Sequence, residues 1–138
     1  MTEPKKILVA EDDEVTRQLM CKTLERQGFQ VMAAEDGIQA YDFALSQHPH
    51  LIITDVDMPG ADGAHFVRRV RNTEELATTP IIVTTGFGTG SATFTLSTGA
   101  DAYEPKPINP MSLIETVRRL LAEGRGAAGV DSLTPEKS

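Results

Sequence analysis

Three short stretches of the chain are apolar without interruption, and they constrain the fold more than any other feature. They are Ile7–Ala10, Leu51–Ile53 and Ile81–Val83. A half-buried strand alternates apolar and polar residues, whereas a strand covered by helices on both faces is apolar throughout. Segments with the apolar spacing of helices separate the three stretches. This alternation predicts a parallel sheet with right-handed crossovers, which is a doubly wound α/β domain.

Strand-like and helix-like segments alternate five times along the chain. Gly28 follows the first predicted helix and Pro80 precedes the fourth predicted strand, which are usual places for these residues. Asp12 or Asp13, and then Asp36, are the expected N-caps of the first two helices. The predicted strands are residues 5–10, 29–33 and 50–54, a run opened by Pro80 and a weaker run around Ala102 and Tyr103. The predicted helices are residues 14–27, 37–47, a segment carrying Phe66, Val67 and Val70, and residues 109–123.

Two helix faces follow from spacing alone. Val15, Leu19 and the turn of Thr23 and Leu24 form a stripe on the first helix that we expect to face the sheet. Arg68, Arg69 and Arg71 cluster on the third predicted helix, and we expect them to form a solvated face.

Residues 86–99 fit a helix poorly, although a crossover helix belongs there. The segment is rich in threonine and glycine, which cost up to about 1 kcal/mol each in helix propensity relative to alanine. We therefore expect a short, weakly anchored fourth helix. Residues 124–138 show no periodicity, so we place the domain at residues 1–123 and interpret the remainder as a flexible tail or the start of a linker.

Composition bounds the class of protein. A length of 138 residues allows one domain with a full hydrophobic core. The formal net charge is −7 and no basic stripe is present, which argues against direct binding of nucleic acid. A single cysteine allows no internal disulfide, and we interpret Cys21 as a small apolar side chain. No apolar run is long enough for a signal peptide or a membrane span, so we expect a soluble, cytoplasmic protein.

Polar residues follow four of the predicted strands. Glu11 and Asp12 come after the first strand, Asp55 after the third, Thr85 after the fourth and Lys106 shortly after the weak fifth. The carboxyl ends of parallel strands share one edge of a sheet, where open α/β folds bind their ligands. These five side chains are therefore expected to converge there.

The convergent set has the chemistry of a metal-assisted phosphoryl site. The Asp55 carboxylate can act as a nucleophile towards phosphorus and form an aspartyl phosphate. Glu11 and Asp12 would then lie beside Asp55, if the first and third strands are neighbours, and all three acids, Asp55 included, would provide oxygen ligands for Mg²⁺. The Thr85 hydroxyl and the Lys106 ammonium would donate to the phosphate oxygens.

Each of these residues also has an ordinary structural explanation. The acids after the first strand could only cap a helix, and Asp55 could only form a turn. Thr85 could be a satisfied strand-end hydroxyl, and Lys106 could be solvated. It is their occurrence at successive strand ends that favours a shared site.

Four segments of the chain together resemble the receiver domain of two-component response regulators. They are residues 7–13, 55–63, 80–86 and 99–107, and the resemblance extends over about residues 5–123. It implies a three-layer, flavodoxin-like fold with a five-stranded parallel sheet in the order 2-1-3-4-5 and five helices. It also implies a signalling protein that catalyses at most its own phosphorylation and dephosphorylation.

The resemblance assigns roles around the metal and the acceptor. Asp55 would accept a phosphoryl group from a sensor histidine kinase or a phosphotransfer protein. Asp12 would bind Mg²⁺ directly, Glu11 through a water molecule, and Asp57 through its main-chain carbonyl. Asp57 also places a carboxylate two residues after the acceptor, where side chains of this family influence the loss of phosphate.

Further roles concern the response to phosphorylation. Thr85 and Lys106 would hold the phosphate, and the Lys106–Pro107 peptide bond is expected to be cis. Tyr103 is similar to the family's switch aromatic, which moves inward when Thr85 turns to the phosphate. A downstream protein would then bind the face formed by the fourth helix, the fifth strand and the fifth helix.

Three other classes of protein share parts of this pattern. Asp55-Val56-Asp57 resembles the motif of haloacid-dehalogenase phosphatases, but the order of the motifs along the chain is reversed. A flavodoxin-like electron carrier needs a neutral phosphate loop after the first strand, where this chain carries acids. A receiver fold that docks partners without phosphorylation remains an alternative, although such proteins usually lack part of the acidic set.

Overall fold

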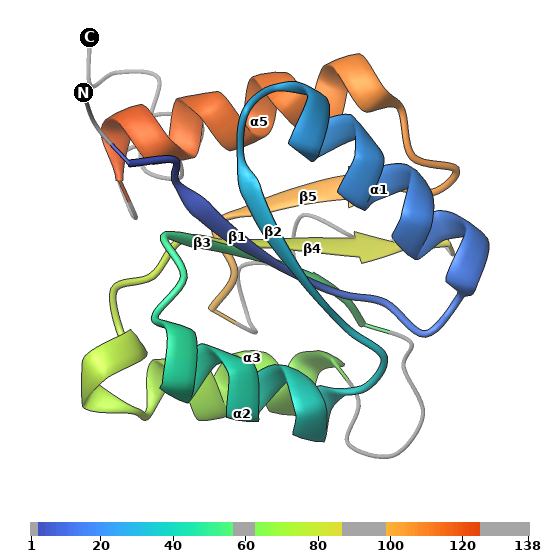
Figure 1. The fold of residues 1–138 in the computed structure, drawn as a ribbon. Helices are drawn as coiled ribbons and strands as arrows, with labels where there is room; N and C mark the ends of the chain where they lie inside the picture. Colours follow the sequence, from blue (N-terminus) through green and yellow to red (C-terminus); the bar gives the residue numbers. More distant parts are fainter. Residues whose placement is uncertain (1–2, 57–62, 87–98, 125–138) are drawn as a thin grey trace, which may run out of the picture.

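The computed structural model describes residues 3–56, 63–86 and 99–124. Five parallel strands form one sheet in the order β2-β1-β3-β4-β5, as predicted (Figure 1). The strands are β1 (Lys6–Ala10), β2 (Gln30–Ala34), β3 (Leu51–Asp55), β4 (Ile81–Thr85) and β5 (Ala102–Pro105). The helices in the described part are α1 (Glu14–Arg26), α2 (Gly37–Gln47), α3 (Gly63–Arg71) and α5 (Pro110–Glu123), and the short 3-10 helix η1 (Glu74–Leu76) follows α3.

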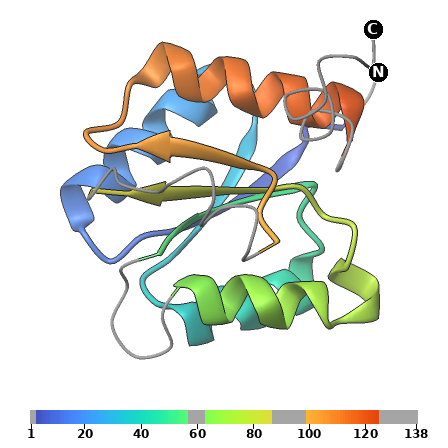
Figure 2. The ribbon, with the colours of Figure 1, turned by 180° about the vertical axis from the view of Figure 1, so that it is seen from behind.

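The helices cover the sheet on both faces. Helices α2 and α3 lie on one face and α1 and α5 on the other, which gives three layers (Figures 1 and 2). Successive strand residues point to opposite faces, so each apolar strand supplies both cores. The α2/α3 core contains Leu8, Ile52, Val83, Ala40, Ala44, Phe66, Val67 and Val70. The α1/α5 core contains Ile7, Val9, Ile53, Ile82, Met20, Leu24, Leu113, Val117 and Leu120.

Side-chain caps determine where three of the helices begin. Asp13 accepts a hydrogen bond from the Thr16 amide at 2.9 Å and caps α1. Asp36 caps α2 and Asn109 caps α5 in the same way. Of the two aspartates considered for the first cap, Asp13 is therefore the one used, and Asp12 is left at the carboxyl edge of the sheet.

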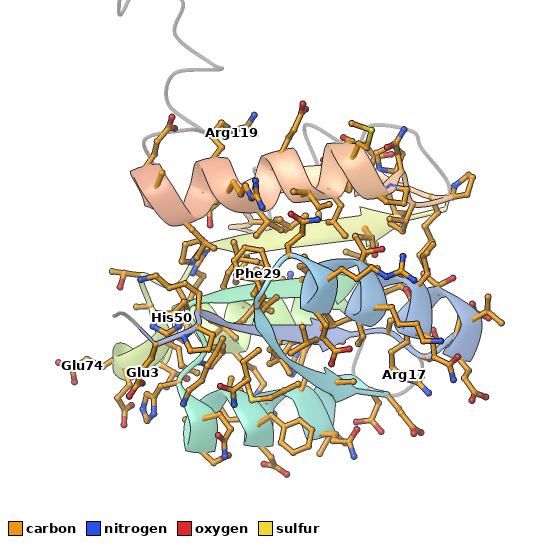
Figure 3. The ribbon with its side chains drawn as sticks, turned by 45° about the horizontal axis from the view of Figure 1, so that its top comes forward. Glu3, Arg17, Phe29, His50, Glu74 and Arg119 are labelled. Atoms are coloured by element: carbon orange, nitrogen blue, oxygen red, sulfur yellow. The ribbon has the colours of Figure 1, made fainter. Side chains whose placement is uncertain are left out.

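Different residues lie at the amino and carboxyl ends of the strands. In Figure 3, His50 lies at the amino end of β3 and Arg17 lies near the opposite edge. The Arg17 guanidinium donates to the main-chain oxygen of Glu11 at 2.9 Å, just beyond β1. The carboxyl edge is the one that holds the predicted site residues.

The predicted inward face of α1 is confirmed for Thr23 and Leu24 but wrong for Val15 and Leu19. Val15 and Leu19 are 77% and 41% exposed, whereas Met20, Thr23 and Leu24 are buried. Val15 and Leu19 have the same four-residue spacing as Met20 and Leu24, so periodicity fits both pairs. The connection from β1 through the Asp13 cap orients the helix so that the second pair contacts the sheet.

The predicted solvated arginine face is wrong for Arg71. Its guanidinium donates from Nε to the Gly99 oxygen at 2.8 Å and from Nη1 to the Thr79 oxygen at 2.7 Å. It also forms an ion pair with Asp101 at 2.8 Å, and Asp101 accepts from the Ile81 amide at 2.9 Å. Arg71 therefore connects the end of α3 to the starts of β4 and β5.

Two sequence predictions fall outside the described residues. The weak fourth helix was placed within residues 86–99, of which 87–98 are not described, and the tail beyond Gly124 is not described either. Within the described ranges, no helix is long and apolar enough to cross a membrane. Cys21 is half-buried against the α1/α5 core, as its interpretation as an apolar side chain predicted.

Candidate functional site

The carboxyl edge of the sheet brings the predicted residues together. Ala10 pairs with Thr54, which places Glu11 beside Asp55 at the ends of β1 and β3. Asp55 pairs with Thr84 of β4, so Thr85 follows at the same edge. The first and third strands are neighbours, as the predicted metal site required.

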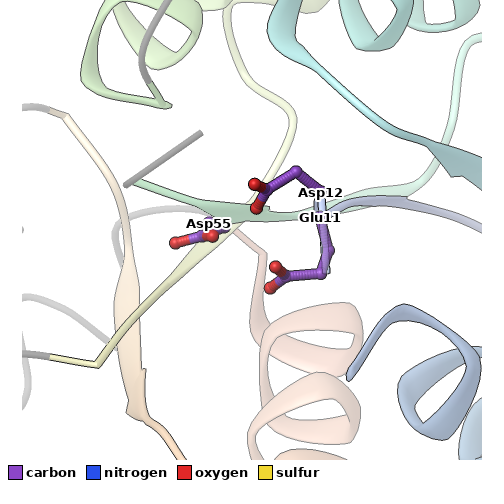
Figure 4. Close-up of side chains that lie close together, drawn as sticks. All are labelled: Glu11, Asp12 and Asp55. Carbon is purple, nitrogen blue, oxygen red and sulfur yellow. The ribbon is translucent and has the colours of Figure 1, made fainter. Parts of the chain in front are cut away.

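Three carboxylates approach one another at this edge. One oxygen each from Glu11, Asp12 and Asp55 lies within 4.8 Å of the others. The side chains converge from the ends of two strands in Figure 4. Glu11 is fully buried and Asp55 is 2% exposed, while Asp12 is exposed. The group thus consists of two buried carboxylates and one exposed carboxylate.

Lys106 lies against the two buried acids. Its Nζ atom is 2.8 Å from Glu11 Oε1 and 3.0 Å from Asp55 Oδ2. Its main-chain amide donates to the Thr85 oxygen at 2.9 Å, which holds the residue at the end of β4. The Lys106–Pro107 peptide bond is cis, as predicted.

Burial and charge shift the pKa values of this group. Desolvation is the main cause that raises the pKa of Glu11 to about 7, and the charge of Asp55 adds to it against the opposing contact with Lys106. Desolvation alone would lower the pKa of Lys106, but the contacts with Glu11 and Asp55 outweigh it and the pKa is raised. Two buried carboxylates share one ammonium, so the pocket favours a further cation.

The donor set suits Mg²⁺. Hard divalent cations take oxygen ligands, and Mg²⁺ is commonly held by one or two carboxylates together with water and phosphate. Glu11, Asp12 and Asp55 provide only carboxylate oxygens. Asp57, whose main-chain carbonyl was predicted as a further ligand, lies outside the described residues.

Thr85 lies at the carboxyl end of β4, and Tyr103 lies within β5. Thr85 is the last residue of β4 and is 8% exposed. Tyr103 pairs in register with Val83 and packs, partly buried, against the α2/α3 core. Their roles towards phosphate remain predictions.

Sequence reasoning missed one buried carboxylate. Glu104 of β5 is 4% exposed and accepts hydrogen bonds from Ser112 and Thr116 of α5. The signal was available as an acid inside a strand, with hydroxyl residues four apart on the following helix. The acid was treated as part of a motif and not as a core position.

A doubly wound sheet of this order, with three acids and a lysine at its carboxyl edge, defines a class of phosphoacceptor signalling domains. The family model for the response regulator receiver domain matches residues 7–118. This chain belongs to the response regulator receiver family, which the motifs had indicated.

Curated relatives agree with this assignment. The polar-differentiation response regulator DivK of Brucella ovis is 30% identical over 120 residues, covering 86% of this chain and 98% of DivK. The response regulator MprA of Mycobacterium sp. strain KMS is 35% identical over 130 residues, covering 94% of this chain but 56% of MprA.

Solved structures match the fold as well. The chemotaxis response regulator CheY4 of Vibrio cholerae has a TM-score of 0.80 and 32% identity, covering 85% of this chain and 98% of CheY4. The receiver domain of the sensor histidine kinase PA1611 from Pseudomonas aeruginosa has a TM-score of 0.80 and 29% identity, covering 86% and 98%. That structure holds a magnesium ion in its active-site cleft.

Proposed function

We propose that Asp55 is the phosphoacceptor of this receiver domain and that a phosphohistidine of a sensor kinase or phosphotransfer protein is the donor. Receiver domains are signalling modules of two-component systems. The observation that supports this assignment most is the ion pair of Asp55 with Lys106 at 3.0 Å, next to Glu11 and Asp12. A carboxylate, a cation site and a fixed ammonium then meet at one point.

In the transfer, an oxygen of Asp55 attacks phosphorus while the bond between phosphorus and the donor nitrogen breaks. The phosphoryl group ends on Asp55 as an acyl phosphate, and the imidazole of the donor leaves. Mg²⁺ held by Asp12, by Glu11 through water and by the Asp57 carbonyl would neutralise charge on the phosphoryl oxygens.

Lys106 would contact a different group before and after phosphoryl transfer. Before transfer its ammonium contacts Asp55, and after transfer it would donate to a phosphate oxygen. The Thr85 hydroxyl would donate to another, and Tyr103 would move inward behind it. Phosphorylation would thereby shift the population between two existing conformations.

The surface that responds would be β5 and α5 together with the predicted fourth helix. Tyr103 and Lys106 belong to, or directly follow, β5, so movement at the site reaches this surface first. We propose a downstream protein as its ligand, in the cytoplasm, rather than nucleic acid or membrane. The acidic net charge of −7 supports this choice.

The test is intact mass after incubation with Mg²⁺ and acetyl phosphate. The expected result is one added phosphoryl group that is labile to base, depends on Mg²⁺ and is absent in Asp55→Asn. Asp42→Asn, an exposed aspartate on α2, is the matched control and should accept the group normally. A phosphoryl adduct on the Asp55→Asn variant would show that another residue is the acceptor.

Two other results would replace the proposal. Steady release of phosphate with no adduct, abolished by Asp55→Asn, would indicate an aspartyl-phosphate hydrolase. Neither adduct nor release would favour a docking module that works without phosphorylation.

A further inference from the structure

A row of polar residues crosses the α1/α5 face of the sheet next to the acceptor. Asp55 pairs in register with Thr84, and Thr84 pairs with Glu104. Register partners in parallel strands point to the same face. Two positions earlier in β3 and β4, Ile53 and Ile82 belong to the apolar α1/α5 core. Thr84 and Glu104 therefore occupy positions where the layer would otherwise continue as apolar packing.

Glu104 is held from the helix opposite. Its Oε1 atom accepts from the Ser112 hydroxyl at 2.9 Å, and Oε2 accepts from the Thr116 hydroxyl at 2.6 Å. The residue is 4% exposed and Thr116 is 6% exposed, so this contact is excluded from water. Within the described residues the buried Thr84 hydroxyl has no hydrogen-bond partner. Glu104 therefore depends on α5 alone for its described side-chain hydrogen bonds.

Stability does not account for a carboxylate here. Burying a charged group costs several kcal/mol, and two neutral hydroxyls offset only part of that cost. Replacing buried ionic groups by apolar residues of similar volume is often neutral or stabilising. A leucine at position 104 would extend the core that Leu113 and Val117 already form. We therefore ask which part of the structure the hydrogen bonds of Glu104 hold in place.

What the contact spans is the loop that carries Lys106. Glu104 and Ser112 lie at the two ends of residues 105–111, and their hydrogen bond closes this loop from the α5 side. On the inner side, the Lys106 amide donates to the Thr85 oxygen. At the far end, the Ser112 amide donates to Asn109, which caps α5. The loop is thus fixed at both ends and at its lysine.

We propose that Glu104 is a positioning residue for Lys106. Its two hydrogen bonds hold the start of α5 against β5, so that the Lys106 ammonium stays directed at the phosphoacceptor. This inference rests on the proposed function, because it assigns Lys106 a task in phosphoryl transfer. The contact involves neither Asp55 nor the phosphate and can persist while the lysine changes partner.

The hydrogen bonds of Glu104 would act by preorganising Lys106. The lysine has to meet charge that develops on the transferring group, and a donor already in place stabilises it without reorganisation. A flexible four-carbon side chain on a loose loop would sample other positions. Displacement of a catalytic group by about 1 Å can lower a rate by up to roughly 100-fold.

The experiment compares Glu104→Leu with Glu104→Gln. Leucine removes both hydrogen bonds and fills the core, whereas glutamine keeps an acceptor oxygen and a similar shape. Thr23→Val is the matched control, since it removes a buried hydroxyl from α1 on the same face, away from the loop. Each protein is assayed for its rate of phosphorylation by acetyl phosphate with Mg²⁺, for its thermal midpoint and for exchange of the Lys106 amide hydrogen.

We expect Glu104→Leu to keep or raise the thermal midpoint while phosphorylation slows by roughly tenfold. Exchange of the Lys106 amide should become faster in the same variant. Glu104→Gln should keep the wild-type rate and Lys106 amide exchange, with a thermal midpoint at least as high as that of the wild-type protein because it buries no charge. Thr23→Val should behave like the wild-type protein in all three measurements. A loss of rate without a loss of thermal stability is not what a purely structural role produces.

Other outcomes overturn the proposal. If Glu104→Leu takes up phosphate at the wild-type rate, Glu104 does not position the lysine. If Glu104→Gln is as slow as Glu104→Leu, the charge and not the hydrogen bonding is responsible. If Glu104→Leu does not fold, the double variant Ser112→Ala/Thr116→Val, which removes both hydroxyl donors to Glu104, is used in its place, and a wild-type rate there has the same meaning. A wild-type protein that gains no phosphoryl group contradicts the proposed function instead, and unchanged Lys106 amide exchange then separately rejects the positioning role.

Discussion

The ammonium of Lys106 lies 3.0 Å from the carboxylate of Asp55, although the two residues are 51 positions apart in the chain. The same ammonium lies 2.8 Å from Glu11. Before any phosphate arrives, the lysine is therefore the counter-ion of two buried acids. The site is assembled in advance, and the Lys106 ammonium contributes directly to its charge balance.

The first prediction follows from this balance. In metal-free buffer, Lys106→Met should lower the free energy of unfolding by about 3 kcal/mol, because two buried carboxylates lose their cation. Saturating Mg²⁺ should restore part of the loss, and it should stabilise the variant more than the wild-type protein because no ammonium competes for the acids. Urea unfolding with EDTA and with Mg²⁺ measures both effects.

Lys22→Met is the control for this experiment. Lys22 is exposed on α1, so its replacement should change the free energy of unfolding by less than about 0.5 kcal/mol in either buffer. Equal stabilisation of Lys106→Met and wild type by Mg²⁺ would show that the lysine and the metal do not share the acids.

The second prediction concerns two glycines with similar backbone conformations. Gly28 has φ +92°, and a Cβ atom added there would have nothing within 4 Å. Gly99 has φ +96°, and a Cβ atom added there would lie 3.3 Å from Arg71 Cγ. Alanine at either site is strained by about 1 kcal/mol. Gly99→Ala should lose about 1 kcal/mol more, since the Arg71 side chain must shift.

Urea unfolding of both variants measures this difference. In an Arg71→Ala background the extra loss at Gly99 should disappear, because the crowded atom is gone. If the excess persists in that background, the cost at Gly99 comes from the backbone and not from the contact with Arg71.

The third prediction tests the connection made by Arg71. Arg71→Lys should lower the free energy of unfolding by about 3 kcal/mol, because an ammonium cannot reproduce the fork that reaches Gly99, Thr79 and Asp101 together. Arg68→Lys, on the exposed side of the same helix, should cost less than about 0.5 kcal/mol. Comparable losses from the two variants, measured by urea unfolding, would contradict this role of Arg71.

Much of this site could be predicted because parallel strands make distant residues meet. Once the apolar stretches are strands, Asp55 and Lys106 must share an edge with Glu11, whatever lies between them. The caps Asp13 and Asp36 were recognisable because a short polar side chain before a helix satisfies its free amides. These inferences depend on local chemistry and on topology.

The failures share a different cause. Periodicity does not settle the rotation of α1 at each turn, so Val15 and Leu19 were placed inside with Thr23 and Leu24, and only the latter two are buried. Arg71 was grouped with its solvated neighbours because its partners, Gly99 and Asp101, are supplied by a distant turn. Glu104 was overlooked in the same way, since only the packing of α5 against β5 shows that it is buried.

The last prediction is a dependence of stability on pH at the other end of the sheet. His50 accepts a hydrogen bond at Nδ1 from the Lys6 amide at 2.9 Å, and its own amide donates to the Lys6 oxygen at 2.8 Å. Desolvation lowers the pKa of His50 from 6.5, and the charges of Lys5 and Lys6 lower it further. Below pH 6.5 the unfolded chain therefore binds a proton more readily than the folded protein does.

It follows that the free energy of unfolding should fall as the pH is lowered through 6.5, because desolvation and the charges of Lys5 and Lys6 disfavour the protonated imidazole in the folded protein. His50→Gln keeps an acceptor oxygen but does not titrate, so its stability should fall less over the same range. Urea midpoints of both proteins from pH 8 down to about pH 5 measure the difference. His48 and His65 are present in both proteins, so the comparison isolates position 50. Parallel pH curves for wild type and His50→Gln would show that His50 does not contribute to the pH dependence of stability.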